Sequence, residues 1–191
     1  NGTTIDQDGC LRPSTDLDGL SGLKLAFDEN GTVTAGTSSP LTDGAAATLI
    51  CDADYAAKNG LKPMARIASF AVSGCKPETM GLGPIFSSRK ALSRAGITSQ
   101  DLSVIEVNEA FATQSIASLR DLDLDPATVN MDGGAIAIGH PLYLTELTFC
   151  GCKLSRIVCP EQKILQCAAQ SLVIDLQVLR SNSGALQFVK P

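Results

Sequence analysis

The chain has 191 residues, of which 44% are hydrophobic and 18% charged, and it carries a net charge of −5. This balance is typical of a globular protein and argues against disorder, and the length is sufficient to bury a core. An acidic chain without a basic stripe is a poor partner for nucleic acid, and no apolar run approaches the roughly 18 to 20 residues that span a bilayer. We therefore expect a globular protein whose partners are neither nucleic acid nor a membrane.

Turns dominate the prediction for the first part of the chain. Residues 31–36 (Gly-Thr-Val-Thr-Ala-Gly) are typical of a short strand, and the Thr, Ser, Pro and Gly residues of 37–44 predict a loop. The small apolar residues 45–51 fit a buried strand and a tight helix equally well.

A helix is predicted just before a domain boundary. Asp52 is a suitable N-cap for a helix through Lys58, and Asn59-Gly60 is a suitable left-handed stop. Pro63 follows closely. We therefore expect the boundary between two domains at residues 59–63.

From residue 65 the pattern alternates between strands and helices. The predicted strands are 65–73, 101–107 and 129–131, and the predicted helices are 87–95, which Gly96 would end, and 110–119. Strands that alternate with helices at this spacing predict an α/β fold, with helices layered on a parallel or mixed sheet.

Residues 142–191 differ in character from the rest. They contain five Lys and Arg against three Asp and Glu, and four of the seven cysteines: Cys150, Cys152, Cys159 and Cys167. A zinc site usually has C-x2-C pairs, so these spacings without a histidine favour unpaired thiols and predict no metal. Residues 161–180 are apolar enough to be partly helical.

One loop stands out for its chemistry. Residues 132–141 (Asp-Gly-Gly-Ala-Ile-Ala-Ile-Gly-His-Pro) contain His140, the only histidine of the chain, and residues 108–112 read Asn-Glu-Ala-Phe-Ala. An imidazole that titrates near neutral pH can accept a proton and later donate one. Taken alone, His140 also fits a surface or capping histidine, and Asn108 fits a helix N-cap. Glu109 fits a first-turn acid that complements a helix dipole.

These two motifs together resemble the paired signature of thiolases. Residues 31–47 and 80–84 resemble other loops of the same family, in the same order, so the likeness covers roughly residues 1–141. The resemblance implies a thiolase-like layered α/β fold that is incomplete. Residues 1–58 would be the end of the N-terminal half and residues 62–141 a truncated C-terminal half. The abrupt change after residue 141 suggests a divergent tail, from a shifted reading frame or alternative splicing.

By this resemblance the chain is related to acetyl-CoA acyltransferases, which cleave 3-ketoacyl-CoA with CoA to acetyl-CoA and a shortened acyl-CoA in fatty-acid β-oxidation. His140 would be the base and an oxyanion donor, and Asn108 would hold a water of the oxyanion hole, so their side chains should converge. The residues implied in substrate or CoA binding are Ser39, Phe111, Gly134 and Gly139. Coenzyme A would be a substrate, and no cofactor is implied.

Two departures from the family pattern concern cysteines. The sequence contains neither the Cys-Ser-Ser-Gly-like turn of the family's nucleophile nor its Cys-x-Gly-Gly-Gly-like loop. We therefore expect a fragment that is inactive alone, because no covalent intermediate forms without the nucleophile. The alternative is a non-catalytic module that binds acyl-CoA or pairs with full-length thiolase subunits, or with itself.

The resemblance leaves the cellular location open. A bacterial protein of this kind would be cytoplasmic, and a eukaryotic one peroxisomal or mitochondrial. Sheet edges that the tail leaves unpaired would be prone to aggregation or swapping.

Overall fold

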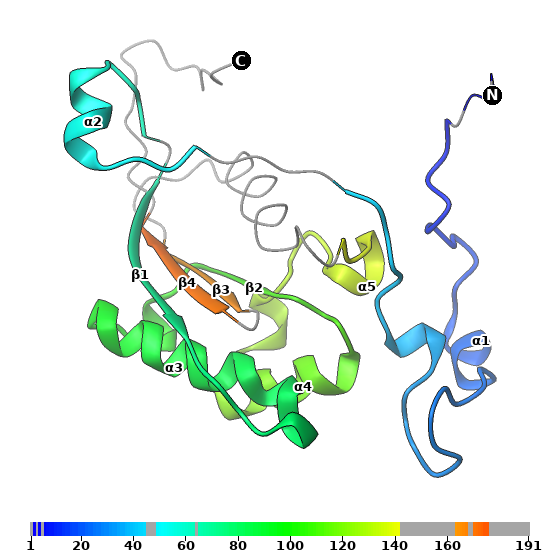
Figure 1. Cartoon of the computed structure of the whole chain (residues 1–191). Coiled ribbons are helices and arrows are strands. Elements are labelled where there is room, and N and C mark those ends of the chain that lie inside the picture. Colours follow the sequence, from blue (N-terminus) through cyan, green and yellow to red (C-terminus); the bar gives the residue numbers. More distant parts are fainter. Residues whose placement is uncertain are drawn as a thin grey trace.

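The computed structural model describes residues 2, 4, 6–44, 49–63 and 65–141, together with the backbone of 163–167 and 170–175. Four strands form one sheet: β1 (Arg66–Val72), β2 (Val104–Val107), β3 (Lys163–Cys167) and β4 (Gln170–Asp175). The sheet order is β1-β4-β3-β2 (Figure 1). β2 and β3 are parallel, whereas β4 is antiparallel to both of its neighbours, so the sheet is mixed. The expected α/β fold with a mixed sheet is confirmed.

The last two strands correct the prediction for residues 161–180. This segment contributes β3 and β4, the two central strands, where partial helix was expected. Leu165, Ala168, Ala169, Leu172 and Leu176 recur at helical spacing, which favours a helix, while the continuous apolar run 172–174 fits a buried strand equally well. The segment becomes two strands because β4 pairs with β1 and β3 pairs with β2.

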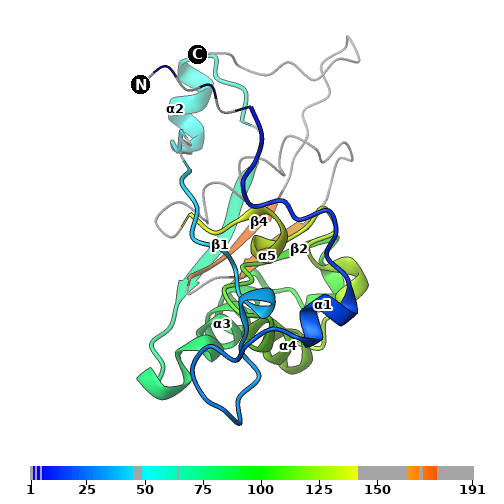
Figure 2. The ribbon, with the colours of Figure 1, turned by 90° about the vertical axis from the view of Figure 1, so that its right-hand side faces the viewer.

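Helices cover one side of the sheet. The main helices are α3 (Gly83–Ala95) and α4 (Ala112–Asp121), and they lie side by side below the sheet (Figures 1 and 2). α3 begins four residues before the predicted start, since Pro84 fits the first helical turn, and it ends at Gly96 as predicted, with φ 68°. α4 is shifted by two residues relative to the prediction.

The core lies between these helices and the sheet. Its buried members come from β1, β2, α3 and the residues after α4: Ala71, Ile85, Ala91, Leu92, Ile105, Val107, Leu122 and Leu124. β1 alternates as predicted, with Ser69 and Ala71 buried and Phe70 and Val72 exposed. The buried Ser69 hydroxyl donates to the Ala91 carbonyl at 2.6 Å and so ties β1 to α3.

The N-terminal segment is mostly helical turns and loops. It contains α1 (Leu17–Ser21), the 3-10 turn η1 (Ala35–Thr37) and α2 (Ala53–Lys58). α2 confirms the prediction, because the Asp52 side chain accepts from the Tyr55 amide at 2.6 Å. The strand expected at residues 31–36 is wrong: Thr34 forms only an isolated bridge with Leu25 and then caps η1. Residues 45–48 of the ambiguous apolar run lie outside the described residues.

The connections between these elements are short. They include the 3-10 turns η2 (Pro77–Leu82), η3 (Ser99–Asp101) and η4 (Pro126–Thr128), and the single-turn helix α5 (Ala135–Ile138). The strand predicted at residues 129–131 is reduced to one parallel bridge between Val129 and Ile105. Asn130 has a positive φ of 49°, which ends any extended segment there. In the described part of the chain, no helix is long and apolar enough to cross a membrane.

Candidate active site

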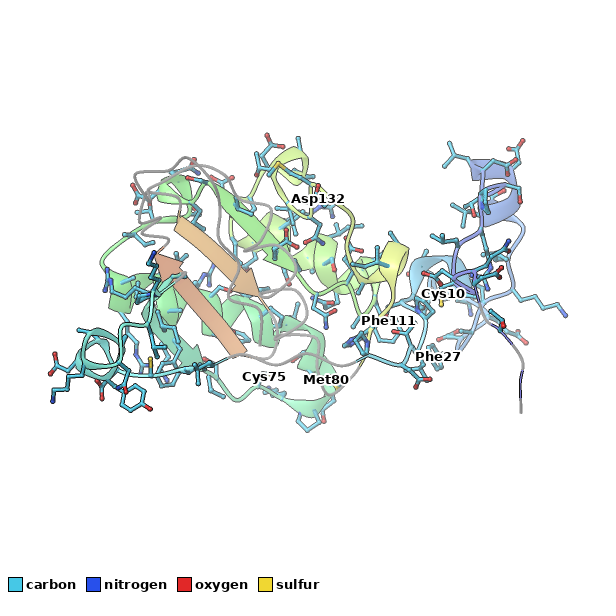
Figure 3. The ribbon with its side chains drawn as sticks, turned by 90° about the horizontal axis from the view of Figure 1, so that it is seen from above. Cys10, Phe27, Cys75, Met80, Phe111 and Asp132 are labelled. Atoms are coloured by element: carbon cyan, nitrogen blue, oxygen red, sulfur yellow. The ribbon has the colours of Figure 1, made fainter. Side chains whose placement is uncertain are left out.

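Three segments that are distant in sequence meet beside the end of β2. The first contact joins the N-terminal loop to the Asn-Glu-Ala-Phe-Ala motif: Ser38 forms an antiparallel bridge with Phe111. Ser39 adds two hydrogen bonds to the Ala110 carbonyl, from its amide at 3.1 Å and from its hydroxyl at 3.3 Å. Phe111 accordingly lies where the N-terminal segment meets the rest of the molecule (Figure 3).

The second contact joins the same N-terminal loop to the histidine loop. The His140 amide donates to the Pro40 carbonyl at 3.1 Å, and Leu41 forms a parallel bridge with His140. Thr42 packs against Gly139, whose φ of 99° and ψ of 163° lie in a region almost restricted to glycine. The N-terminal loop therefore lies between the two motifs and binds to both.

The Asn108 and His140 side chains converge, as the sequence analysis predicted. Asn108 follows directly after Val107, the last residue of the fully buried strand β2. Its Nδ2 lies 3.2 Å from His140 Nε2, and His140 is only 8% exposed. When the Asn108 amide donates, His140 Nε2 accepts, which places the imidazole proton on Nδ1. Asn108 Oδ1 is buried and has no hydrogen-bond partner among the described residues.

The competing interpretations of Asn108 and Glu109 as helix-end residues are wrong. The N-cap of α4 is Phe111, without a side-chain hydrogen bond, and α4 begins only at Ala112. Asn108 is thus not an N-cap, and Glu109 is not in the first turn of α4. Both side chains point instead toward the histidine loop, where Glu109 Oε2 accepts from the Ile136 amide at 3.1 Å.

Gly134 gives the Glu109 carboxylate its space. A Cβ at this position would overlap the Glu109 carboxyl group. The backbone of Gly134, with φ −105° and ψ −165°, is open to any residue. Gly134 and Gly139 thus each approach a protein side chain, and ligand binding at either one stays a prediction.

Asn130 is a residue that the sequence analysis missed. Its Oδ1 accepts from the Val107 amide at 2.8 Å, and its Nδ2 donates to the Val107 carbonyl at 2.8 Å. The side chain thus replaces a neighbouring strand for the last residue of β2. The same Nδ2 donates to Glu109 Oε1 at 2.7 Å. Asparagine tolerates the positive φ seen here, and that preference was the available signal.

Cys167 has a position that its sequence context does not indicate. It is the last residue of β3 and pairs in parallel register with Val107, so its backbone lies beside the last residue of β2, directly before Asn108. The other three tail cysteines, Cys150, Cys152 and Cys159, lie outside the described residues. Among the residues whose side chains are described, no group of three His, Cys, Asp or Glu is arranged to hold a metal ion.

The mixed sheet, its helical layer and the buried amide–imidazole pair beside the end of β2 define a layered α/β protein with a polar site at a strand end. The thiolase C-terminal domain family matches residues 61–180, and the thiolase N-terminal domain family matches residues 1–54. The chain belongs to the thiolase family. The C-terminal match includes β3 and β4, so the family pattern continues beyond the histidine loop.

Relatives with two activity names are similar to this chain. An acetyl-CoA acetyltransferase of Paracoccus denitrificans is 52% identical over 140 residues, which are 73% of this chain and 36% of the relative. A 3-ketoacyl-CoA thiolase of Idiomarina loihiensis is 50% identical over 157 residues, 80% of this chain and 38% of the relative. The chain therefore spans little more than a third of the length of these curated relatives.

Solved structures agree with the sequence relatives. Human mitochondrial 3-ketoacyl-CoA thiolase in complex with CoA superposes with a TM-score of 0.79 at 35% identity, over 91% of this chain and 46% of that one. The dimeric peroxisomal thiolase of Saccharomyces cerevisiae superposes with a TM-score of 0.79 at 33% identity, over 87% of this chain and 44% of that one.

Proposed function

We propose that this chain carries the histidine and asparagine part of a thiolase site for 3-ketoacyl-CoA and CoA, and that it does not complete turnover alone. The observation that supports the proposal is the Asn108–His140 pair, held 3.2 Å apart with His140 nearly buried. In low-polarity surroundings, preorganised donors of this kind stabilise a developing oxyanion far more than they would in water.

The two side chains suit both proton transfer and oxyanion stabilisation. With Asn108 as donor, His140 Nε2 is unprotonated and is the basic nitrogen that can remove a thiol proton. Once Nε2 is protonated, it and Asn108 Nδ2 are both donors, and an anionic oxygen placed against them would receive two hydrogen bonds. Asn108 Oδ1 could meanwhile accept from a water, which would relieve the cost, about 1–3 kcal/mol, of a buried unpaired oxygen.

The CoA-binding residues of the proposal are Ser39, Phe111, Gly134 and Gly139. Ser39 reaches Ala110 with a long hydroxyl bond of 3.3 Å, so its oxygen lone pairs can accept from an amide of the pantetheine arm. Phe111 lies next to this contact through its bridge with Ser38 and would form an apolar wall. The CoA complex of the human relative supports CoA as the ligand class.

Catalytic incompetence follows from the missing nucleophile. Thiolysis by a ping-pong route needs a cysteine that becomes acylated, and the sequence has no Cys-Ser-Ser-Gly-like turn. Purified chain should show no thiolysis of acetoacetyl-CoA above that of His140→Ala. A rate near that of a complete thiolase, abolished by His140→Ala, would refute this part of the proposal. Cys167→Ser tests whether any residual rate depends on the cysteine beside β2.

CoA binding is best measured through the NMR signals of His140, the only histidine of the chain. Because the chain has one imidazole, its NMR signals need no assignment among competitors. Addition of CoA should shift the His140 ring signals, and Asn108→Ala should reduce that shift while exposed Ser21→Ala leaves it unchanged. Unmoved His140 signals at saturating CoA would contradict a CoA site at this loop.

The alternative function is a non-catalytic module that assembles with thiolase subunits. The dimeric state of the yeast relative motivates it. Size-exclusion chromatography with a full-length homologue should then show a stable mixed assembly, while CoA leaves His140 unaffected. A CoA-dependent shift with no assembly favours the acyl-CoA site.

A further inference from the structure

We propose that Glu109 is a positioning residue that sets the spacing of Asn108 and His140. This inference rests on the proposed role of those two residues in acyl transfer. The Glu109 carboxylate lies between the end of β2 and the start of α5 and contacts both, through Asn130 and through the Ile136 amide. It therefore joins the element that carries Asn108 to the loop that carries His140.

The contacts require a group that accepts on both oxygens. Oε1 receives the Asn130 side-chain amide at 2.7 Å, and Oε2 receives the Ile136 backbone amide at 3.1 Å. A carboxylate serves two donors at once, whereas a glutamine of the same shape has one acceptor and would turn its NH2 group toward the other donor. The site therefore requires the two acceptor oxygens of a glutamate, and a glutamine of the same size does not supply them.

Asn130 makes the bridge rigid on the β2 side. Its side chain binds both the amide and the carbonyl of Val107, the residue directly before Asn108, at 2.8 Å each. On the other side, Gly134 leaves room for the carboxylate against the backbone of the histidine loop. The chain of contacts from Val107 through Asn130 and Glu109 to Ile136 is therefore continuous. We infer that it preorganises the amide–imidazole pair before any ligand binds.

The test is the tautomer of His140 in ligand-free protein. In the wild type the Nε2 nitrogen should show the 15N shift of an unprotonated acceptor at pH values where the ring is neutral. In Glu109→Gln this signal should move toward the tautomer-averaged position, because Asn108 no longer faces Nε2 in a fixed orientation. Glu29→Gln, at an exposed loop residue, is the matched control and should leave the signal in place. A general loss of stability would not move the tautomer of the folded form.

An unchanged His140 signal in folded Glu109→Gln would overturn the inference. If that variant fails to fold, Asn130→Asp decides, because it places an acceptor against Glu109 and should cause the same change. The wild type gives a third measurement: the Ile136 amide should exchange slowly with solvent, and exchange at an unprotected rate would also overturn the inference. None of these readouts uses CoA. A missing CoA response would therefore contradict the proposed function while leaving the positioning role measurable.

Discussion

Replacement of Gly134 by alanine tests the packing between the histidine loop and Glu109. The added Cβ would overlap the Glu109 carboxyl group, while the extended backbone of Gly134 accepts alanine without strain. Overpacking of this kind costs about 1–3 kcal/mol. The lower entropy of the unfolded chain returns about 0.4–1 kcal/mol. We expect Gly134→Ala to lose about 1–2 kcal/mol in free energy of unfolding, since the overpacking cost exceeds the entropic gain.

The matched background for this experiment is Glu109→Ala. All three of the nearest atoms that the new Cβ would meet belong to Glu109, so truncation of that side chain opens the space. In this background Gly134→Ala should be neutral or slightly stabilising. Urea unfolding of the four proteins of the double-mutant cycle measures the coupling, which we expect to be about 1–3 kcal/mol between these touching residues. Equal losses in both backgrounds would show that the overlap is not the cause.

The remaining predictions concern one backbone position, one buried hydrogen bond and one sheet edge. Gly139→Ala should cost about 1–3 kcal/mol, because φ 99° with ψ 163° is a conformation that alanine avoids and Thr42 occupies the space. Gly96→Ala, at φ 68° with open space, should cost less, and thermal unfolding that ranks the two in the opposite order would contradict this reasoning. Ser69→Ala should lose about 0.5–1.5 kcal/mol in urea unfolding through its 2.6 Å bond to Ala91, and a stability equal to wild type would show that the bond contributes nothing. Lys90 and Arg94 donate to the Val72 and Phe70 carbonyls of the edge strand β1, so the double replacement by alanine should raise light scattering on incubation. Arg89→Ala is the control, since Arg89 pairs with Asp121 away from β1, and equal aggregation of both would disprove edge protection.

Local chemistry in the sequence was sufficient for several elements. Asp52 and Gly60 delimit α2 because a capping carboxylate and a left-handed glycine act within one helical turn. Gly96 ends α3 for the same reason. The convergence of Asn108 and His140 was predicted differently, from the resemblance of the two motifs to thiolases, and the 3.2 Å contact confirms it.

Tertiary structure decided the elements whose partners are distant in sequence. β3 and β4 form because β1 and β2 supply hydrogen bonds on either side of them, although the apolar residues of 161–180 recur at helical spacing. Val129 and Thr34 each form one isolated bridge and not a strand, because among the described residues their chain neighbours do not continue the pairing. The role of Glu109 likewise depends on a donor 27 residues away, the Ile136 amide, and no pattern around position 109 encodes it. The sequence by itself determined the local helix caps and identified Asn108 and His140 as candidate site residues. Only the folded chain determined which groups hold them in place, since hydrogen bonds across the sheet and between loops form only after the segments meet.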